Sequence, residues 1–191
     1  MNKQLILAKG IYPRKYFHFL ILFILSLFCN TTFGYDFSEP NAEGIKMFYK
    51  IVGPDEVWVT YEWWNNNFYG EWRIAEGYQD VTDIIIPETV THNGITYRIT
   101  NLEVGCFQSS AKLETVVIGD NVTELNRQAF QNCTALKSIT WGKNLESFGT
   151  LVLNHCTSLK KIILPSETAL RAWCTHSWTN DPSIFGQCPE V

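Results

Sequence analysis

The sequence contains none of the short motifs that mark common catalytic sites. It has no nucleophile elbow, no phosphate-binding loop and no His-Glu-x-x-His pair, and each of these motifs places a reacting group in a defined setting. Its acidic residues are scattered along the chain. We therefore expect a protein that is not an enzyme, with no catalytic residues and no cofactor.

Closely paired metal ligands are also missing. Structural zinc sites normally use pairs such as Cys-x2-Cys, and only Cys174-Thr-His176 places two candidate ligands close together. His155, Cys156 and Cys188 are separated from this pair. The spacing predicts no metal site, and it leaves Cys174 with Cys188 as the pair to test for a disulfide.

Basic residues are scarce after the first 34 positions. All 19 acidic residues lie beyond Gly34, together with only eleven of the 15 Lys and Arg, so residues 35–191 carry a net charge of −8. A surface of this sign offers no basic patch to phosphate groups. We expect no nucleic-acid partner and no binding to anionic lipid.

The apolar run near the N-terminus is too short for a membrane-spanning helix. Residues 17–29 are mostly Phe, Leu and Ile, but the run has only 13 residues, whereas a spanning helix takes about 20. A basic leader precedes it and Thr32-Phe33-Gly34 follows it, as is typical of a secretory signal. We predict that residues 1–34 are a signal peptide cleaved after Gly34, which makes the protein secreted or cell-surface, with no membrane insertion of the mature chain. An uncleaved membrane anchor is the alternative.

A repeat of constant length dominates the second half of the chain. Leu113, Leu136 and Leu159 follow one another at equal spacing, and Cys133 and Cys156 are separated by the same interval. A fixed period of this length is typical of a solenoid, in which the two cysteines stack as small buried side chains. We predict a short solenoid over residues 81–191, with about four coils, a parallel β-sheet on one face and an irregular C-terminal coil.

Each coil is predicted to contain two short strands and one turn. The apolar phrase that follows each repeated Leu is short and β-branched, which favours a strand. Residues 122–125 predict a second strand, and residues 127–132 predict a single helical or 3₁₀ turn. In the next unit Leu151-Val152-Leu153 replaces the Ala129-Phe130 phrase, which predicts a looser turn there.

The residues before the repeats predict a β-rich N-terminal cap. Residues 47–52 and 57–63 are rich in β-branched and aromatic side chains, and Gly53-Pro54-Asp55 separates them, which indicates a hairpin. A solenoid needs such a cover over its first coil, so we assign residues 35–80 to a cap. A tight type I′ turn is predicted at Asn93-Gly94, inside an insertion in the first coil.

The repeat resembles the BspA-like leucine-rich repeats of bacterial surface proteins. Residues 122–133, Val-Thr-Glu-Leu-Asn-Arg-Gln-Ala-Phe-Gln-Asn-Cys, follow that pattern closely, and Ile84-Ile-Ile-Pro87 and Ile162-Ile-Leu-Pro165 match its strand end. The resemblance implies a leucine-rich-repeat fold. It also implies an exported protein that acts in adhesion, with host extracellular-matrix proteins such as fibronectin and fibrinogen among the suggested ligands.

The outward positions of the predicted sheet form the first candidate ligand-binding surface. If the repeated Leu and Ile side chains point inward, then Ile85, Val117, Thr140 and Ile163 form an exposed row. An exposed apolar row often marks a contact surface. The alternative is an ordinary solvated sheet whose β-branched residues reflect strand propensity.

Charged residues flank this row and complete the predicted site. They are Glu114, Lys137 and Lys160, and they change from acidic to basic along the stack. Together with the apolar row, they favour non-catalytic recognition of a protein ligand along the sheet face.

An aromatic segment near the N-terminus gives a second candidate surface. Trp63, Trp64, Asn66 and Tyr69 combine flat rings with amides, which suits a glycan-binding module. The alternative is that these rings pack on the first coil, because large aromatic side chains are usually mostly buried. A third interpretation is a structural or truncated repeat protein.

The signal-peptide assignment predicts the N-terminus of the exported protein. When the full sequence is expressed in an exporting bacterial host, the recovered chain should begin within a few residues of Tyr35, because signal peptidase cleaves after small residues. N-terminal sequencing and intact mass check this. A chain that keeps Met1 and stays in the membrane fraction would favour the uncleaved anchor instead.

Overall fold

A computed structural model describes residues 34–65 and 74–171. All of these residues belong to one compact unit. The predicted signal peptide, apart from Gly34, lies outside the described residues, and so do Cys174, His176, Cys188 and the end of the predicted C-terminal coil.

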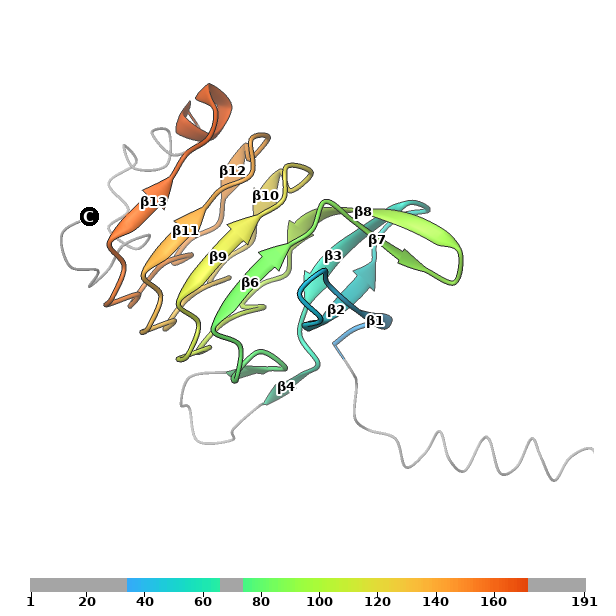
Figure 1. The fold of residues 1–191 in the computed structure, drawn as a ribbon, viewed down its shortest axis with the longest axis horizontal. Helices are drawn as coiled ribbons and strands as arrows, with labels where there is room; N and C mark the ends of the chain where they lie inside the picture. The colour runs from blue at the N-terminus through green and yellow to red at the C-terminus, as the bar shows by residue number, and fades with distance from the viewer. Residues whose placement is uncertain (1–33, 66–73, 172–191) are drawn as a thin grey trace, which may run out of the picture. The chain divides into compact units, whose positions relative to one another are not determined.

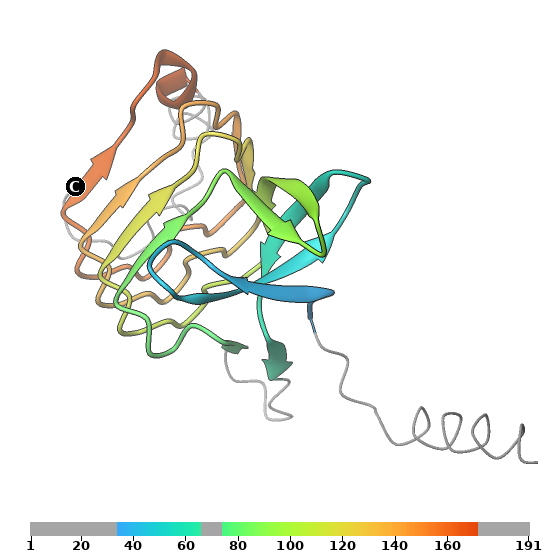
Figure 2. The same cartoon turned by 45° about the vertical axis from the view of Figure 1, so that its right-hand side comes forward.

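A parallel β-sheet of four strands follows the repeat. Its members are β6 (Asp83–Ile86), β9 (Thr115–Ile118), β11 (Ser138–Thr140) and β13 (Lys161–Ile163), in the order β13-β11-β9-β6. Figures 1 and 2 show these strands side by side, each contributed by a separate turn of the chain. The prediction of a parallel sheet on one face of a solenoid is confirmed, whereas the number of coils stays a prediction.

A second sheet combines the N-terminal strands with the far side of the coils. The path runs β1-β2-β3-β8-β10-β12, and β7 pairs with β8 beside it. The bounds are β1 Phe37–Pro40, β2 Lys46–Ile51, β3 Glu56–Thr60, β7 Thr89–His92, β8 Ile95–Leu102, β10 Glu124–Leu125 and β12 Ser147–Phe148. Because β3 pairs in parallel with β8, the N-terminal hairpin extends the sheet of the coils.

The two predicted hairpin turns are present. Strands β2 and β3 pair in antiparallel fashion on either side of the Gly53-Pro54-Asp55 turn. Asn93 and Gly94 join β7 to β8 with φ angles of 51° and 79°, and two positive φ angles are what a type I′ turn requires. A further antiparallel pair is formed by β4 (Trp63–Asn65) and β5 (Ile74–Glu76). The boundary at residue 80 between cap and repeats stays a prediction.

The segment predicted as a helical turn is instead a series of three β-turns, the middle one closed by Gln131 N–H donating to Gln128 O at 3.1 Å. Ala129 N–H donates to Asn126 O at 3.3 Å and Cys133 N–H donates to Phe130 O at 3.3 Å. Between them, Gln128 and Asn132 both have a φ angle of 62°, which is incompatible with a right-handed helix. The prediction was wrong because the left-handed residues turn every second backbone N–H group toward the next coil, where it donates to a carbonyl group instead of forming a helical hydrogen bond. Phe130 N–H, for example, donates to Val152 O at 3.0 Å.

The third coil repeats the same turns despite its different sequence. Leu151 and His155 have φ angles of 61°, which matches Gln128 and Asn132 in the coil before. Val152 and Leu153 are fully buried where Ala129 and Phe130 stand. The prediction of a looser turn therefore fails at the left-handed positions, which are preserved, although Val152 N–H does not donate to Gly149 O as Ala129 N–H donates to Asn126 O.

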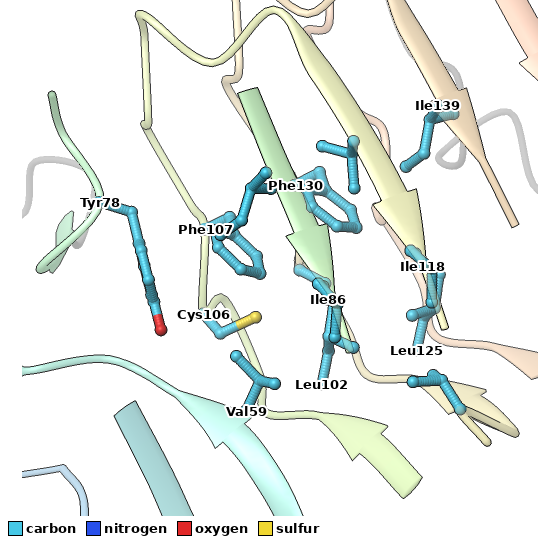
Figure 3. Packing of buried hydrophobic residues seen from close by; sticks show 14 of the residues in the cluster. Val59, Tyr78, Ile86, Leu102, Cys106, Phe107, Ile118, Leu125, Phe130 and Ile139 are labelled. Carbon is cyan, nitrogen blue, oxygen red and sulfur yellow. The ribbon is translucent and has the colours of Figure 1, made fainter. Parts of the chain in front are cut away.

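Equivalent side chains stack on one another inside the coils. Cys133 and Cys156 are both fully buried, as predicted. The Cys133 Sγ lies 3.1 Å from Phe107 O and the Cys156 Sγ lies 3.2 Å from Phe130 O. Figure 3 shows Phe107 and Phe130 beside each other, with ring centroids 5.2 Å apart and planes inclined by 5°. Burial raises the pKa of the Cys133 thiol to about 12.

A ladder of buried amides runs along the same stack. Gln108 Nε2 donates to Gln131 Oε1 at 2.7 Å, and Gln131 Nε2 donates to Asn154 Oδ1 at 3.3 Å. All three side chains are buried, and they occupy the same place in successive coils. Buried polar groups need such partners, because an unpaired one costs about 1–3 kcal/mol.

Glycines set the closest approach between coils. A Cβ on Gly119 would lie 2.8 Å from Ile86 O, and a Cβ on Gly142 would overlap Gly119 O. Both neighbouring atoms belong to the backbone, which cannot move aside as a flexible side chain could. These two positions therefore need glycine to let the chains stack.

Replacing Gly142 by Ala should destabilise the protein by about 2 kcal/mol or more, because the added methyl group overlaps the Gly119 carbonyl. Gly53→Ala is the matched control. Its Cβ would meet Glu56 Cβ at an ordinary 3.5 Å, so its effect should stay within about 1 kcal/mol. Denaturant unfolding monitored by tryptophan fluorescence compares the two, and equal stability of both variants would contradict this account of coil stacking.

Candidate ligand-binding face

The predicted apolar row is assembled across the parallel sheet. Ile85 lies opposite Val117, Val117 opposite Thr140, and Thr140 opposite Ile163 in the strand registers. Ile85, Val117 and Ile163 keep 44%, 40% and 37% of their surface exposed, and Thr140 is partly exposed. We call these four residues the apolar stripe.

Alternation along each strand explains why the stripe faces outward. In β6, Ile84 and Ile86 are buried on either side of Ile85, and in β9, Val116 and Ile118 are buried on either side of Val117. Successive side chains of a strand point to opposite faces. The core therefore takes the flanking residues and leaves the central one exposed.

The predicted charged residues lie beside the stripe, on consecutive coils. Lys137 Nζ donates to Glu114 Oε2 at 2.6 Å. The backbone N–H of Lys160 donates to Lys137 O at 2.9 Å, so Lys160 lies beside Lys137 on the next coil. The Lys160 side chain is exposed, and it has no ion pair among the residues described.

A second pair of charges lies on the other side of the stripe and was not predicted. Lys143 donates to Asp120 twice, from its backbone N–H at 3.0 Å and from Nζ at 2.6 Å. These bonds lower the pKa of the Asp120 carboxyl and raise the pKa of the Lys143 ammonium. The two residues are one repeat length apart, as Leu113 and Leu136 are, and this spacing was the signal in the sequence that would have revealed the pair.

Asp83 lies at the end of the face formed by β6. Its carboxylate accepts hydrogen bonds from the hydroxyl groups of Thr115 and Thr82. These bonds, the one from Thr115 first, lower the pKa of the Asp83 carboxyl. Asp83 is exposed and carries no ion pair within residues 34–65 and 74–171.

The predicted glycan surface lies mostly outside the described part of the chain. Trp63 and Trp64 belong to β4, but their side chains are not among those described, and Asn66 and Tyr69 lie outside the described residues altogether. That surface stays a prediction.

The described residues contain neither a metal-ligand cluster nor a membrane-spanning helix. No three His, Cys, Asp or Glu side chains of residues 34–65 and 74–171 come together in a way that suits a metal ion. Cys156 is buried against Phe130, and the His155 ring contacts the Asn154 side chain. In the same residues, no helix has the length and apolar character needed to cross a bilayer.

Solved structures of leucine-rich-repeat proteins are similar to this chain. One from Bacteroides capillosus has a TM-score of 0.50 and 20% identity, and the match covers 70% of this chain and 94% of that one. The leucine-rich-repeat protein of T. pallidum has a TM-score of 0.50 and 16% identity, and the match covers 66% of this chain and 50% of that one. These likenesses define the class as a leucine-rich-repeat fold.

A leucine-rich cell surface protein of Faecalibacterium prausnitzii is also similar, with 22% identity and a TM-score of 0.48. The match covers 69% of this chain, and the chain spans 32% of the length of that protein. No curated protein matches the sequence.

The family itself is shown by the repeat. Residues 77–177, more than half of the chain, match the BspA-type leucine-rich-repeat region in six copies. The chain therefore belongs to the BspA-type leucine-rich-repeat family, as its residues predicted.

The ion pair beside the stripe predicts a defined pH dependence. Replacing Lys143 by Met should raise the pKa of Asp120 toward its ordinary value, because the main partner that lowers it is lost. The lowered pKa stabilises the folded protein above the ordinary carboxyl pKa, and that contribution is lost as the pH falls through the folded value. The variant should therefore lose less stability on acidification than the parent does.

Carbon-detected NMR titration of the Asp side chains measures this change. Lys112→Met is the control, since Lys112 pairs with Asp80 at 2.5 Å and lowers the pKa of that carboxyl instead. It should shift Asp80 and leave Asp120 unchanged. An Asp120 pKa that stays the same in Lys143→Met would contradict the assignment.

Proposed function

We propose that this chain is a secreted or cell-surface binding protein that recognises a protein ligand along the face of its parallel sheet, without catalysis. The observation that supports the proposal is the apolar stripe, in which Ile85 and Val117 are exposed neighbours and the partly exposed Thr140 joins them to the exposed Ile163. Contiguous exposed apolar rows with polar rims are typical of contact surfaces.

The dimensions of the face favour a protein over a small molecule. Four strands about 4.8 Å apart place the outer two about 14 Å from each other, and the exposed side chains form rows across them. Small ligands bind in concave sites that bury most of their surface. A broad row of side chains with charged neighbours instead resembles the apolar centre and polar rim of a protein interface.

Membership of the BspA-type family supports the same function and location. Its repeats supply an extended surface, and the similar protein of Faecalibacterium prausnitzii is described as a cell surface protein. The adhesin role, the export of this chain and the identity of the ligand are part of the proposal. Host extracellular-matrix proteins are the first ligands to test.

Glutamate substitutions in the stripe should abolish binding to a protein ligand. The protein, expressed from its full sequence and exported, is measured by biolayer interferometry against fibronectin, fibrinogen, other matrix proteins and a set of glycans. Ile85→Glu and Val117→Glu should each weaken protein binding by at least about tenfold, because they place a charge within the apolar stripe. Their melting temperatures should change little, since both positions are already exposed.

Ile51→Glu is the matched control. Ile51 lies in β2, outside the parallel sheet, and it is 44% exposed, the same as Ile85. It should bind as the parent does. Protein binding that survives both stripe substitutions would refute the proposed face, and binding to glycans alone would move the site to the aromatic segment around Trp63 and Trp64.

A further inference from the structure

The charges on the sheet face are ordered in the same sense on both sides of the apolar stripe. On one side, Asp83 and Glu114 lie on the first two coils, and Lys137, Lys160 and Lys161 lie on the last two. On the other side, Glu88 and Asp120 precede Lys143. The β6–β9 half of the face is therefore acidic, and the β11–β13 half is basic.

Neighbouring coils neutralise only the middle of this arrangement. Lys137 pairs with Glu114, and Lys143 pairs with Asp120, across the boundary between β9 and β11. The outer charges remain. Among the described residues, neither Asp83 on β6 nor Lys161 on β13 has an ion-pair partner.

A face ordered in this way is complementary to itself. A two-fold axis that lies in the face, parallel to the strands and midway between β9 and β11, exchanges β6 with β13 and β9 with β11. Under this operation Asp83 meets Lys161, Glu114 meets Lys137 and Asp120 meets Lys143 of the second copy.

The apolar stripe is matched by the same operation. Ile85 of one copy meets Ile163 of the other, and Val117 meets Thr140. Lys160 meets the uncharged Thr82, and Glu88 meets the uncharged Ser166, so no like charges are opposed. A contact between two identical surfaces must have this property, because each residue pair occurs twice about the axis.

We propose that the protein recognised by the sheet face is a second copy of this chain, held face to face with its strands roughly parallel to those of the first. The proposal rests on the proposed function and names its partner. Two sheets pack in this manner about 10 Å apart, with strand directions within about 30°. The two apolar stripes form the centre of the contact. The ordered charges favour the arrangement in which the coils of the second copy run in the opposite order, with β13 opposite β6.

The contact is small, so the association is weak. Four strands about 14 Å across and about four residues long cover only a few hundred Å², below the roughly 600 Å² that each partner contributes to the smaller stable interfaces. We expect dimers at protein concentrations on the order of 100 μM. Many copies on facing surfaces would strengthen such a contact through multivalency.

Complementary charge reversals test the proposal. Sedimentation equilibrium is measured on the exported full-sequence protein and on its Asp83→Lys and Lys161→Glu variants. Each variant alone should self-associate about tenfold more weakly than the parent, because like charges then meet at two sites of the dimer. An equimolar mixture of the two should recover association, because each mixed dimer opposes opposite charges at both sites.

Salt and a stripe variant complete the test. Raising the salt from about 50 mM to about 500 mM should weaken association of the parent, because exposed charges are screened. Val117→Glu should abolish it. Lys112→Glu is the matched control, since it reverses a charge in the exposed Lys112–Asp80 pair, which precedes β6 and β9 and is not among the charges opposed in the dimer, and it should leave association unchanged.

The outcomes separate this inference from the proposed function. A parent protein that stays monomeric at these concentrations, or a mixture that fails to recover, overturns the inference. If the same protein still binds a matrix protein through Ile85 and Val117, the proposed function stands with a different partner. A folded parent protein that neither self-associates nor binds a matrix protein overturns both the inference and the proposed function.

Discussion

The structure depends on a constant register between successive coils, held by backbone hydrogen bonds. Lys137 N–H donates to Glu114 O at 2.7 Å, and Lys160 N–H donates to Lys137 O at 2.9 Å, each to the equivalent residue of the preceding coil. On the turn side Phe107 N–H donates to Ala129 O at 2.9 Å. Because these bonds fix the distance between coils, Gly119 and Gly142 have no space for a side chain. Every other residue is then placed next to its equivalent in the neighbouring coil.

This placement has opposite consequences inside and outside the solenoid. Inside, like residues suit one another: Phe107 stacks on Phe130, and the amide of Gln108 donates to that of Gln131. Outside, identical charged residues would repel. Most outward positions therefore vary from coil to coil, Lys137 and Lys160 being an exception, and they hold the differences that distinguish one side of the face from the other.

The same division explains how much the sequence could predict. The constant period of the repeat predicted the sheet, its register and the exposed stripe, because register follows directly from the repeat. It failed at residues 127–132, where Gln128 and Asn132 adopt left-handed conformations. Asparagine often adopts this conformation but glutamine does not, so the sequence signals it only at Asn132. It also missed the Asp120–Lys143 pair, which comes after the apolar phrase. The aromatic segment around Asn66 and Tyr69 has no repeat to guide it, and it lies outside the described residues.

The order of the charges is more than coil stability requires. Exposed ion pairs contribute at most about 1 kcal/mol each, and strict alternation of acidic and basic residues would supply such a pair at every step. The face instead places Lys160 beside Lys137 on adjacent coils, and like charges side by side on a sheet are destabilising. At this step the face has two neighbouring lysines where an ion pair would be more stable. Such a departure from stability is expected on a surface that is used for binding. The separation of acidic from basic coils is therefore better explained by what meets the face than by what holds the coils together.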